Sequence, residues 1–134
     1  MERIRLTVAC GVSLFAAVPA FAASCDPGRA PTVPVIKNLP YKQARTMILA
    51  DGWRAVPGQP HGTLSDNEAT FRERGYTELQ FCRLNADSLC RFEFASQGGV
   101  LLWVTTTGDE NPALDSQAVV KAARLSCLAD GDPG

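Results

Sequence analysis

Histidine is nearly absent from this sequence, because His61 is the only one among 134 residues. Structural zinc sites combine cysteine and histidine ligands, and about two to four residues usually separate their paired cysteines. The sequence also lacks the C-x-x-C motif of thiol redox centres. Seven residues separate Cys82 from Cys90 instead. These absences predict that the chain holds no metal ion and no cofactor.

A strong net charge is lacking too, and so is any long apolar run after residue 22. The formal net charge of −1 gives no electrostatic reason to expect nucleic acid or an anionic membrane as a partner. A membrane-spanning helix needs about 20 apolar residues. The Gly98-Gly99 pair has no phosphate-loop spacing around it. We therefore expect no nucleic-acid partner and no membrane insertion of residues 23–134.

The N-terminus carries the longest apolar stretch. Two arginines precede an apolar run over residues 6–21, which ends in the small-x-small sequence Ala-Phe-Ala. This three-part layout is typical of a secretory signal peptide. We predict that residues 1–22, including Cys10, are a signal peptide. Residues 23–134 then form a single domain of ordinary size, either periplasmic or secreted.

Four cysteines remain after the predicted cleavage, namely Cys25, Cys82, Cys90 and Cys127. An even number of cysteines in a small exported chain indicates disulfides, because the compartments outside the cytoplasm oxidise paired thiols. Three connectivities are possible. We favour Cys82 with Cys90, which flank a short loop, and Cys25 with Cys127, which would join the two ends of the domain.

Two segments have the periodicity and the end signals of helices. Residues 41–51 place apolar side chains at spacings of three and four, with Pro40 at the start and Gly52 just past the end. The shared face holds Tyr41, Ala44, Met47 and Ile48. Residues 65–74 begin with Ser65 and Glu68 at capping-box spacing, which predicts that each side chain caps a backbone amide of the other residue. Gly75 would end this second helix.

Other segments predict extended chain. Residues 26–40 are rich in proline and should run extended. Strand candidates are residues 53–56, 76–82, 90–95 and 100–107, with a hairpin turn at 96–99. In the third of these, Cys90, Phe92 and Phe94 share one face. Residues 119–127 fit either a helix or a strand, and we favour a strand with Val119, Ala123, Leu125 and Cys127 on one face.

Together these elements predict an α+β domain with two disulfides, in which one or two helices cover an antiparallel sheet of about four strands. A set of residues also resembles an uncharacterised family of small exported proteobacterial proteins with an LPYxxAR, GW and CxFxF pattern. The residues are Pro34, Val35, Ile36, Leu39, Pro40, Tyr41, Ala44, Arg45, Gly52, Trp53, Cys82, Cys90, Phe92, Phe94, Gly99, Leu102, Val104, Thr106 and Gly108. This resemblance implies a helix packed on an antiparallel sheet and a periplasmic or secreted setting, and it implies no particular activity.

A shorter stretch is similar to the opening of a PASTA module. It runs from Val33-Pro34-Val35 through the helix at Ala44 and Gly52 to the sequences Gln59-Pro60 and Gly62-Thr63. The likeness implies cell-wall peptides or peptidoglycan fragments as ligands. The chain then departs from the module pattern, because a cysteine-bearing stretch follows and only one copy is present.

Binding is the function that this composition favours. Trp53 with Arg54, and Trp103 with its neighbouring threonines, would offer flat aromatic area and polar edges to a protein, a peptide or a cell-wall fragment. The alternative is that both tryptophans fill the core. We expect a non-enzymatic binding protein of the cell envelope. A second hypothesis is an inhibitor of a secreted hydrolase that presents the loop 83–89.

A third hypothesis is a minor hydrolase. His61 lies close in sequence to Ser65 and Asp66, but a triad also needs a group that orients the histidine. An acid pair could instead serve a glycosidase. The candidate acids are Asp51, Asp66, Glu68, Glu73, Glu78 and Glu93. No pair among them is singled out by the sequence, so we predict no catalytic residue.

Overall fold

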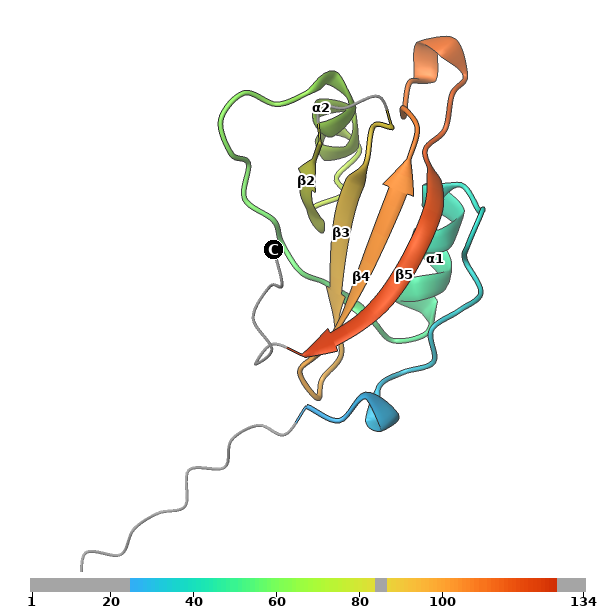
Figure 1. Cartoon of the computed structure of the whole chain (residues 1–134), viewed down its shortest axis with the longest axis vertical. Coiled ribbons are helices and arrows are strands. Elements are labelled where there is room, and N and C mark those ends of the chain that lie inside the picture. Colours follow the sequence, from blue (N-terminus) through green and yellow to red (C-terminus); the bar gives the residue numbers. More distant parts are fainter. Residues whose placement is uncertain (1–24, 84–86, 128–134) are drawn as a thin grey trace, which may run out of the picture.

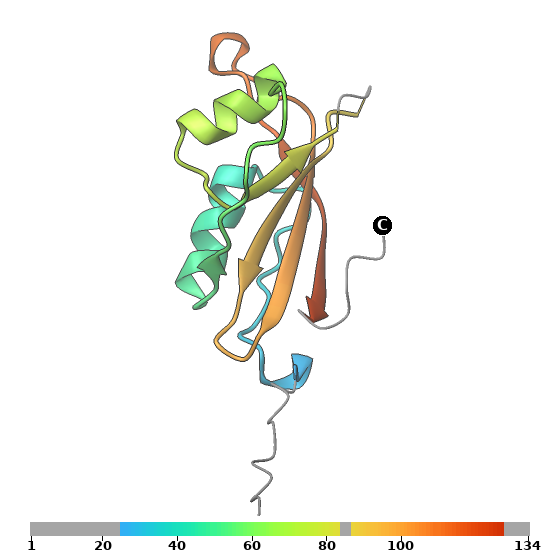
Figure 2. The same cartoon turned by 90° about the vertical axis from the view of Figure 1, so that its left-hand side faces the viewer.

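The computed structural model describes residues 25–83 and 87–127. They form one five-stranded antiparallel sheet with two helices on the same face (Figures 1 and 2). The predicted signal peptide lies outside the described residues. The strands are β1 (Arg54–Ala55), β2 (Leu79–Cys82), β3 (Cys90–Ala95), β4 (Val100–Thr107) and β5 (Val119–Cys127), and the helices are α1 (Tyr41–Ala50) and α2 (Asp66–Glu73). The predicted α+β class is confirmed.

The strands follow the order β1-β3-β4-β5, and β2 also pairs with β3. All pairs are antiparallel. Because β4 occupies one edge of β3, the short strands β1 and β2 share its other edge, and β1 lies beside the C-terminal end of β3. Counting these two short strands separately gives one more strand than the sequence predicted.

Helix α1 begins and ends where the sequence predicts. Pro40 precedes its first residue, and Gly52 adopts φ +97° just past its end, a left-handed conformation that glycine reaches without a Cβ clash. Tyr41, Ala44 and Ile48 are fully buried, so the predicted apolar face packs on the sheet. The Tyr41 ring stacks on Phe92 of β3 with a centroid distance of 3.8 Å.

Helix α2 confirms half of the predicted capping box. The Ser65 hydroxyl accepts a hydrogen bond from the Glu68 backbone N–H at 3.1 Å, as an N-cap should. The Glu68 carboxylate does not return to Ser65, and this part of the prediction is wrong. It instead accepts hydrogen bonds from Arg72, one turn further along the helix, at 2.9 and 3.2 Å.

Strands β3 and β4 supply the floor of the core. Cys90, Phe92 and Phe94 are buried while Arg91 and Glu93 are partly exposed, which confirms the predicted alternation. Strand β4 lies between β3 and β5 and is buried on both faces over most of its length. Its core-facing residues are Val100, Leu102, Val104 and Thr106.

The ambiguous segment at residues 119–127 is a strand, as favoured. It pairs with β4 from Thr107 opposite Val119 to Val100 opposite Cys127. A bulge leaves Lys121 unpaired, because Thr106 faces Val120 while Thr105 faces Ala122. The extra residue shifts the alternation, so the residue that shares the core side with Ala123, Leu125 and Cys127 is Val120 and not Val119.

Both favoured disulfides are confirmed. Cys25 pairs with Cys127 across 102 residues of sequence, and Cys82 pairs with Cys90 across the β2–β3 ladder.

Two other predictions need correction. Residues 27–29 form a short 3₁₀ helix, η1 (Pro27–Arg29), because the Asp26 carboxylate caps the Gly28 backbone N–H. The predicted strand at 76–82 begins only at Leu79, after a turn.

Candidate functional site

Among the described residues, one face of the sheet carries no helix. Figure 2 shows α1 and α2 on one side of the strands and neither of them on the other. On this uncovered face, where strand alternation and register also place Glu93 of β3 opposite Trp103, four polar or aromatic side chains line one hollow: Arg91 of β3, Trp103 and Thr105 of β4, and Arg124 of β5. Together with Ala122 they line a hollow of about 180 Å³.

Trp103 is the centre of this cluster. The guanidinium carbon of Arg91 lies 3.6 Å from the centroid of its ring, and that of Arg124 lies 4.6 Å away. Arg91 also lies over the Phe81 ring of β2, at 5.8 Å. Cation–π contacts of this kind fix a guanidinium at a definite place on a surface. We call Arg91, Trp103 and Arg124 the arginine–tryptophan cluster.

The polar groups of this cluster are not all satisfied within the fold. The buried indole N–H of Trp103 has no hydrogen-bond partner in the described part of the chain. Arg124 is exposed, and among residues 25–83 and 87–127 it makes the cation–π contact but no ion pair. A ring that is 7% exposed thus holds a solvent-facing guanidinium in place.

The other predicted binding residues lie elsewhere. Trp53 is 2% exposed and its indole N–H donates to the Thr32 carbonyl oxygen at 3.2 Å, so the expectation that it faces a ligand is wrong. It fills the core because it ends the turn that follows α1. Arg54 is exposed on β1, at the opposite edge of the sheet from Arg124. The three predicted binding residues therefore do not form one site.

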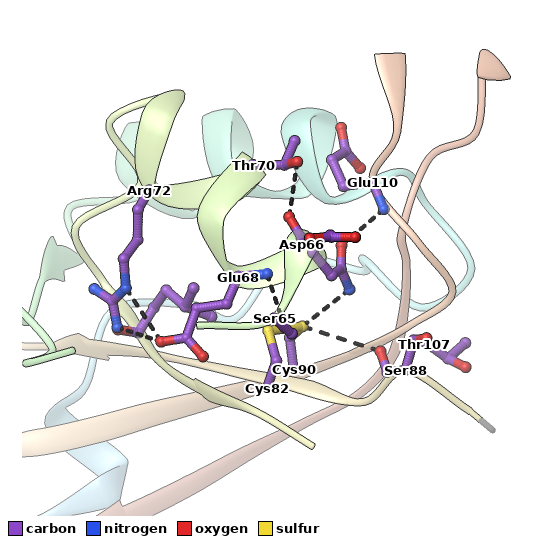
Figure 3. Close-up of a disulfide and its surroundings, with 12 residues drawn as sticks. Ser65, Asp66, Glu68, Thr70, Arg72, Cys82, Ser88, Cys90, Thr107 and Glu110 are labelled. Carbon is purple, nitrogen blue, oxygen red and sulfur yellow. Dashed lines mark hydrogen bonds and ion pairs between the residues drawn. A yellow bond between two sulfur atoms is a disulfide. The ribbon is translucent and has the colours of Figure 1, made fainter. Parts of the chain in front are cut away.

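A second hollow, of about 550 Å³, opens beside the start of α2 and the Cys82–Cys90 disulfide (Figure 3). Its lining is polar and includes Asp66, Asn67 and Glu110. Asn67 connects α2 to β3 and to the loop after β4, because its side-chain N–H donates to the Cys90 sulfur at 3.3 Å and its side-chain oxygen accepts from the Glu110 backbone N–H at 2.8 Å. Sequence reasoning missed Asn67, whose partners are more than 20 residues away.

Five polar side chains that line this second hollow already have partners in the fold, namely those of Ser65, Asn67, Thr70, Glu110 and Asn111. The Ser65 hydroxyl caps α2, and the Thr70 hydroxyl donates to the Asp66 carbonyl oxygen at 2.9 Å. The Glu110 carboxylate accepts from Arg74 at 2.6 Å and from the Ala118 backbone N–H at 2.8 Å. The sulfurs of Cys82 and Cys90 form a disulfide. This hollow is a weaker candidate than the uncovered sheet face, because five of its polar side chains are used in holding α2 and the loops together.

Glu78, one of the candidate acids, is fully buried against α1. Its carboxylate accepts from the Tyr41 hydroxyl at 2.6 Å and from Arg45 Nε at 2.6 Å. Burial, together with the neighbouring Glu78 charge, raises the pKa of Tyr41 far above its ordinary range. Burial is the largest single influence and lowers the pKa of Arg45, but the hydrogen bond to Glu78 and the neighbouring negative charges together outweigh it, so the pKa of Arg45 is raised. The Tyr-x-x-Ala-Arg motif at 41–45 therefore joins a helix to the sheet.

In the described part of the chain, no hydrogen bond or ion pair joins His61 to Ser65 or to any of the candidate acids. His61 is exposed in the loop before α2, and the Ser65 hydroxyl is engaged as a cap. Asp51 and Glu73 are exposed, and Glu68 is paired with Arg72. In residues 25–83 and 87–127, no group of three His, Cys, Asp or Glu side chains is arranged to hold a metal ion.

The loop at 83–89 lies partly outside the described residues, which omit 84–86. Its ends are anchored, because the Arg83 N–H donates to the Leu89 carbonyl at 2.7 Å and the Thr107 hydroxyl donates to the Asp87 carbonyl at 2.9 Å. Over the described residues, no helix is long and apolar enough to cross a bilayer.

Comparison with known proteins returns no relative. The chain matches no protein-family model, no curated protein and no solved structure. The two resemblances drawn from the sequence therefore stay predictions, and the function has to be argued from the surface of the molecule.

Proposed function

We propose that this chain is an exported, non-enzymatic binding protein whose uncovered sheet face recognises a partner that carries carboxylates. One observation supports the proposal above the others. Arg91 and Arg124 lie over Trp103 on the face that the helices leave bare, at 3.6 and 4.6 Å from the ring centroid. The arginine–tryptophan cluster is thus the binding site, and Trp103 is a residue that the sequence analysis also selected.

The chemistry of the cluster favours a carboxylate. A guanidinium that is held over an aromatic ring loses less conformational entropy when it binds a ligand. Its planar N–H groups can donate two parallel hydrogen bonds to one carboxylate. Arg124 is exposed and supplies this group.

Peptides and cell-wall fragments both carry such carboxylates, and they are the partner classes that the sequence favoured. Export is supported by the three-part layout of residues 1–22 and by two disulfides, since disulfides persist in oxidising compartments. N-terminal sequencing of protein from a periplasmic or culture-medium fraction tests export. The expected first residue is Ala23, and a retained Met1 would contradict cleavage.

Fluorescence of Trp103 tests the binding site. The Trp53→Phe variant leaves Trp103 as the single tryptophan, because the chain has two. This variant is titrated with muropeptides from digested peptidoglycan and with an acidic peptide of alternating glutamate and valine. We expect at least one of these probes to shift or quench the emission.

The same titration in Arg124→Gln and Lys42→Gln variants shows where the probe binds. Loss of Arg124 should weaken binding by about tenfold, as expected for a charge-assisted contact. Lys42 is exposed on α1, on the helix side of the molecule, and its loss should leave binding unchanged. Absence of any response to both probes, or equal affinity in the two variants, would reject the proposal.

A further inference from the structure

The outer edge of β5 is paired over only its first residues. The Val120 N–H donates to the Leu39 carbonyl at 2.9 Å, and the Asn38 N–H donates to the Val120 carbonyl at 2.8 Å. Beyond this point, residues 121–125 are exposed and make no backbone hydrogen bond to any described residue on the outer side. Alternate residues of an edge strand direct their N–H and C=O groups outward, so this stretch can accept another strand.

A groove follows this open edge. It measures about 360 Å³ and lies between β5 and the segment before α1, which runs alongside β5 (Figure 1). Its floor is apolar and includes Ile36, Ala123 and Val35, whose side chain is the most exposed large hydrophobic one described, at 88%. Two cations, Lys37 and Lys121, border it.

The groove adjoins the hollow of the arginine–tryptophan cluster on β5. Ala122 lines both the groove and the hollow over Trp103. An extended ligand lying along residues 121–125 would therefore reach Lys121 at one end and Arg124 at the other.

We infer that the partner is an acidic peptide segment that adds to the outer edge of β5 as a further strand. This inference rests on the proposed function, because it uses the same Arg124 to hold a carboxylate. Main-chain pairing with residues 121–125 would supply affinity, an apolar side chain would cover the floor at Val35 and Ala123, and acidic side chains would meet Lys121 and Arg124.

The charges on the edge of β5 favour an acidic peptide over a second copy of the chain as the added strand. A lysine on a sheet edge is a common protection against unwanted strand pairing. Two copies joined edge to edge would place Lys121 and Arg124 against the same cations of the other copy. Like charges directly opposite one another destabilise a strand pair. An acidic strand does not meet this repulsion. The charges on the edge of β5 therefore disfavour pairing with a second copy and favour an acidic partner.

Binding of a fluorescein-labelled peptide of about eight residues, alternating valine and glutamate, tests the inference by anisotropy. Three matched peptides serve as controls. One has lysine in place of every glutamate, the second carries backbone N-methyl groups on the valines only, and the third carries them on the glutamates only. Only alternate N–H groups of an added strand face β5, so one N-methyl peptide should bind like the parent and the other should bind roughly tenfold or more weakly. Hydrogen exchange should show protection of amides within residues 121–125.

Charge-reversed variants complete the test. Lys121→Glu with Arg124→Glu should abolish binding of the glutamate peptide and create binding of the lysine peptide. Lys42→Glu, on the exposed side of α1, is the matched control and should change neither.

Equal binding of the two N-methyl peptides would overturn strand addition. The proposed function would survive that result if Trp103 fluorescence still responded to the parent peptide. Equal binding of the lysine and glutamate peptides, or self-association of the protein through residues 121–125, would overturn the choice of an acidic partner. Loss of both the anisotropy and the Trp103 signals would reject the inference and the proposed function together.

Discussion

Glu78 is the buried charge on which the contact between α1 and the sheet depends. Its carboxylate is fully buried and is held by Tyr41 and Arg45, which lie more than 30 residues earlier in the sequence. A buried charge is tolerated when it is paired and hydrogen-bonded, and it becomes costly when one partner is removed. The Tyr-x-x-Ala-Arg motif therefore has a structural role that requires no ligand.

Removal of Arg45 should destabilise the protein strongly. The Arg45→Gln variant leaves the Glu78 charge without its cation, at a cost of about 3–5 kcal/mol in the free energy of unfolding. Denaturant titration of the oxidised protein measures this. Arg29→Gln is the control, because the pair of Arg29 with Asp26 is exposed and should contribute almost nothing. Similar losses in the two variants would contradict the role given to Glu78.

The raised pKa of Tyr41 predicts that the folded protein loses stability at alkaline pH. Burial, followed by the Glu78 charge, raises the pKa of Tyr41 in the folded state, so the folded protein keeps this proton while an unfolded tyrosine loses it above about pH 10. The contribution of Tyr41 is therefore complete below pH 10 and is lost progressively as the pH rises above that value.

The Tyr41→Phe variant isolates this effect. At neutral pH it should lower the free energy of unfolding by about 1.5–3 kcal/mol, the value of a hydrogen bond to a charged group. Between about pH 9 and pH 11 its stability should fall less than that of the wild type, because phenylalanine has no proton to lose. Parallel stability curves for the two proteins over this range would show that Tyr41 does not cause the alkaline loss.

At the scale of elements, α2 depends on its first residue. Ser65→Ala removes the oxygen that accepts the Glu68 N–H and should cost about 1 kcal/mol. Thr70→Ala is a matched control inside the same helix. The Thr70 hydroxyl only returns to the carbonyl of Asp66, a bond that does not favour the helix, so its loss should be nearly neutral. Thermal unfolding distinguishes them, and a Thr70→Ala variant that lost as much as Ser65→Ala would contradict the capping assignment.

The elements themselves were predictable because their signals are local. Pro40 and Gly52 bracket α1, Ser65 starts α2, and the alternation at 90–94 gives the core face of β3. The segment 119–127 was ambiguous because its pattern serves both a helix and a strand. The segment is a strand because it pairs with β4. The bulge at Lys121 changes which of its residues face the core, and no local sequence pattern predicts that bulge.

The candidate site was predictable only at Trp103. Arg91 is on the solvent side of β3 by alternation, but its contact with Trp103 requires the β3–β4 register. Arg124 meets Trp103 only because the bulge sets the β4–β5 register. Trp53 was selected by the same composition as Trp103. Both rings are buried, but Trp53 belongs to the core cluster while Trp103 lies on the face without helices, and only tertiary packing sets this difference.

At the scale of the whole molecule, the Cys25–Cys127 disulfide joins the two ends of the described chain. It closes a loop of 102 residues of sequence, whereas Cys82–Cys90 closes one of 8. In the chain-entropy model the long loop contributes about 4.5 kcal/mol and the short one about 2.5 kcal/mol.

Paired serine variants should therefore differ in stability. The Cys25→Ser/Cys127→Ser variant should lose more of the free energy of unfolding than the Cys82→Ser/Cys90→Ser variant, as measured by denaturant titration. Intact mass of the unmodified wild type should correspond to four oxidised cysteines at these positions. A larger loss from the short loop would contradict the entropic account, and free thiols at the four positions would contradict the assignment of an oxidising compartment.

The helices cover one face of the sheet, the arginine–tryptophan cluster lies on the other, and we propose that this other face binds the partner. Nuclear magnetic resonance of ¹⁵N-labelled protein, titrated with the acidic peptide, locates the binding face residue by residue. Binding there should shift the signals of the Trp103 indole N–H, of Arg124 and of the amides of β4 and β5, and should leave the start of α2 unchanged. Shifts confined to the hollow at residues 65–70 and 109–111, or to the exposed side of α1, would contradict it.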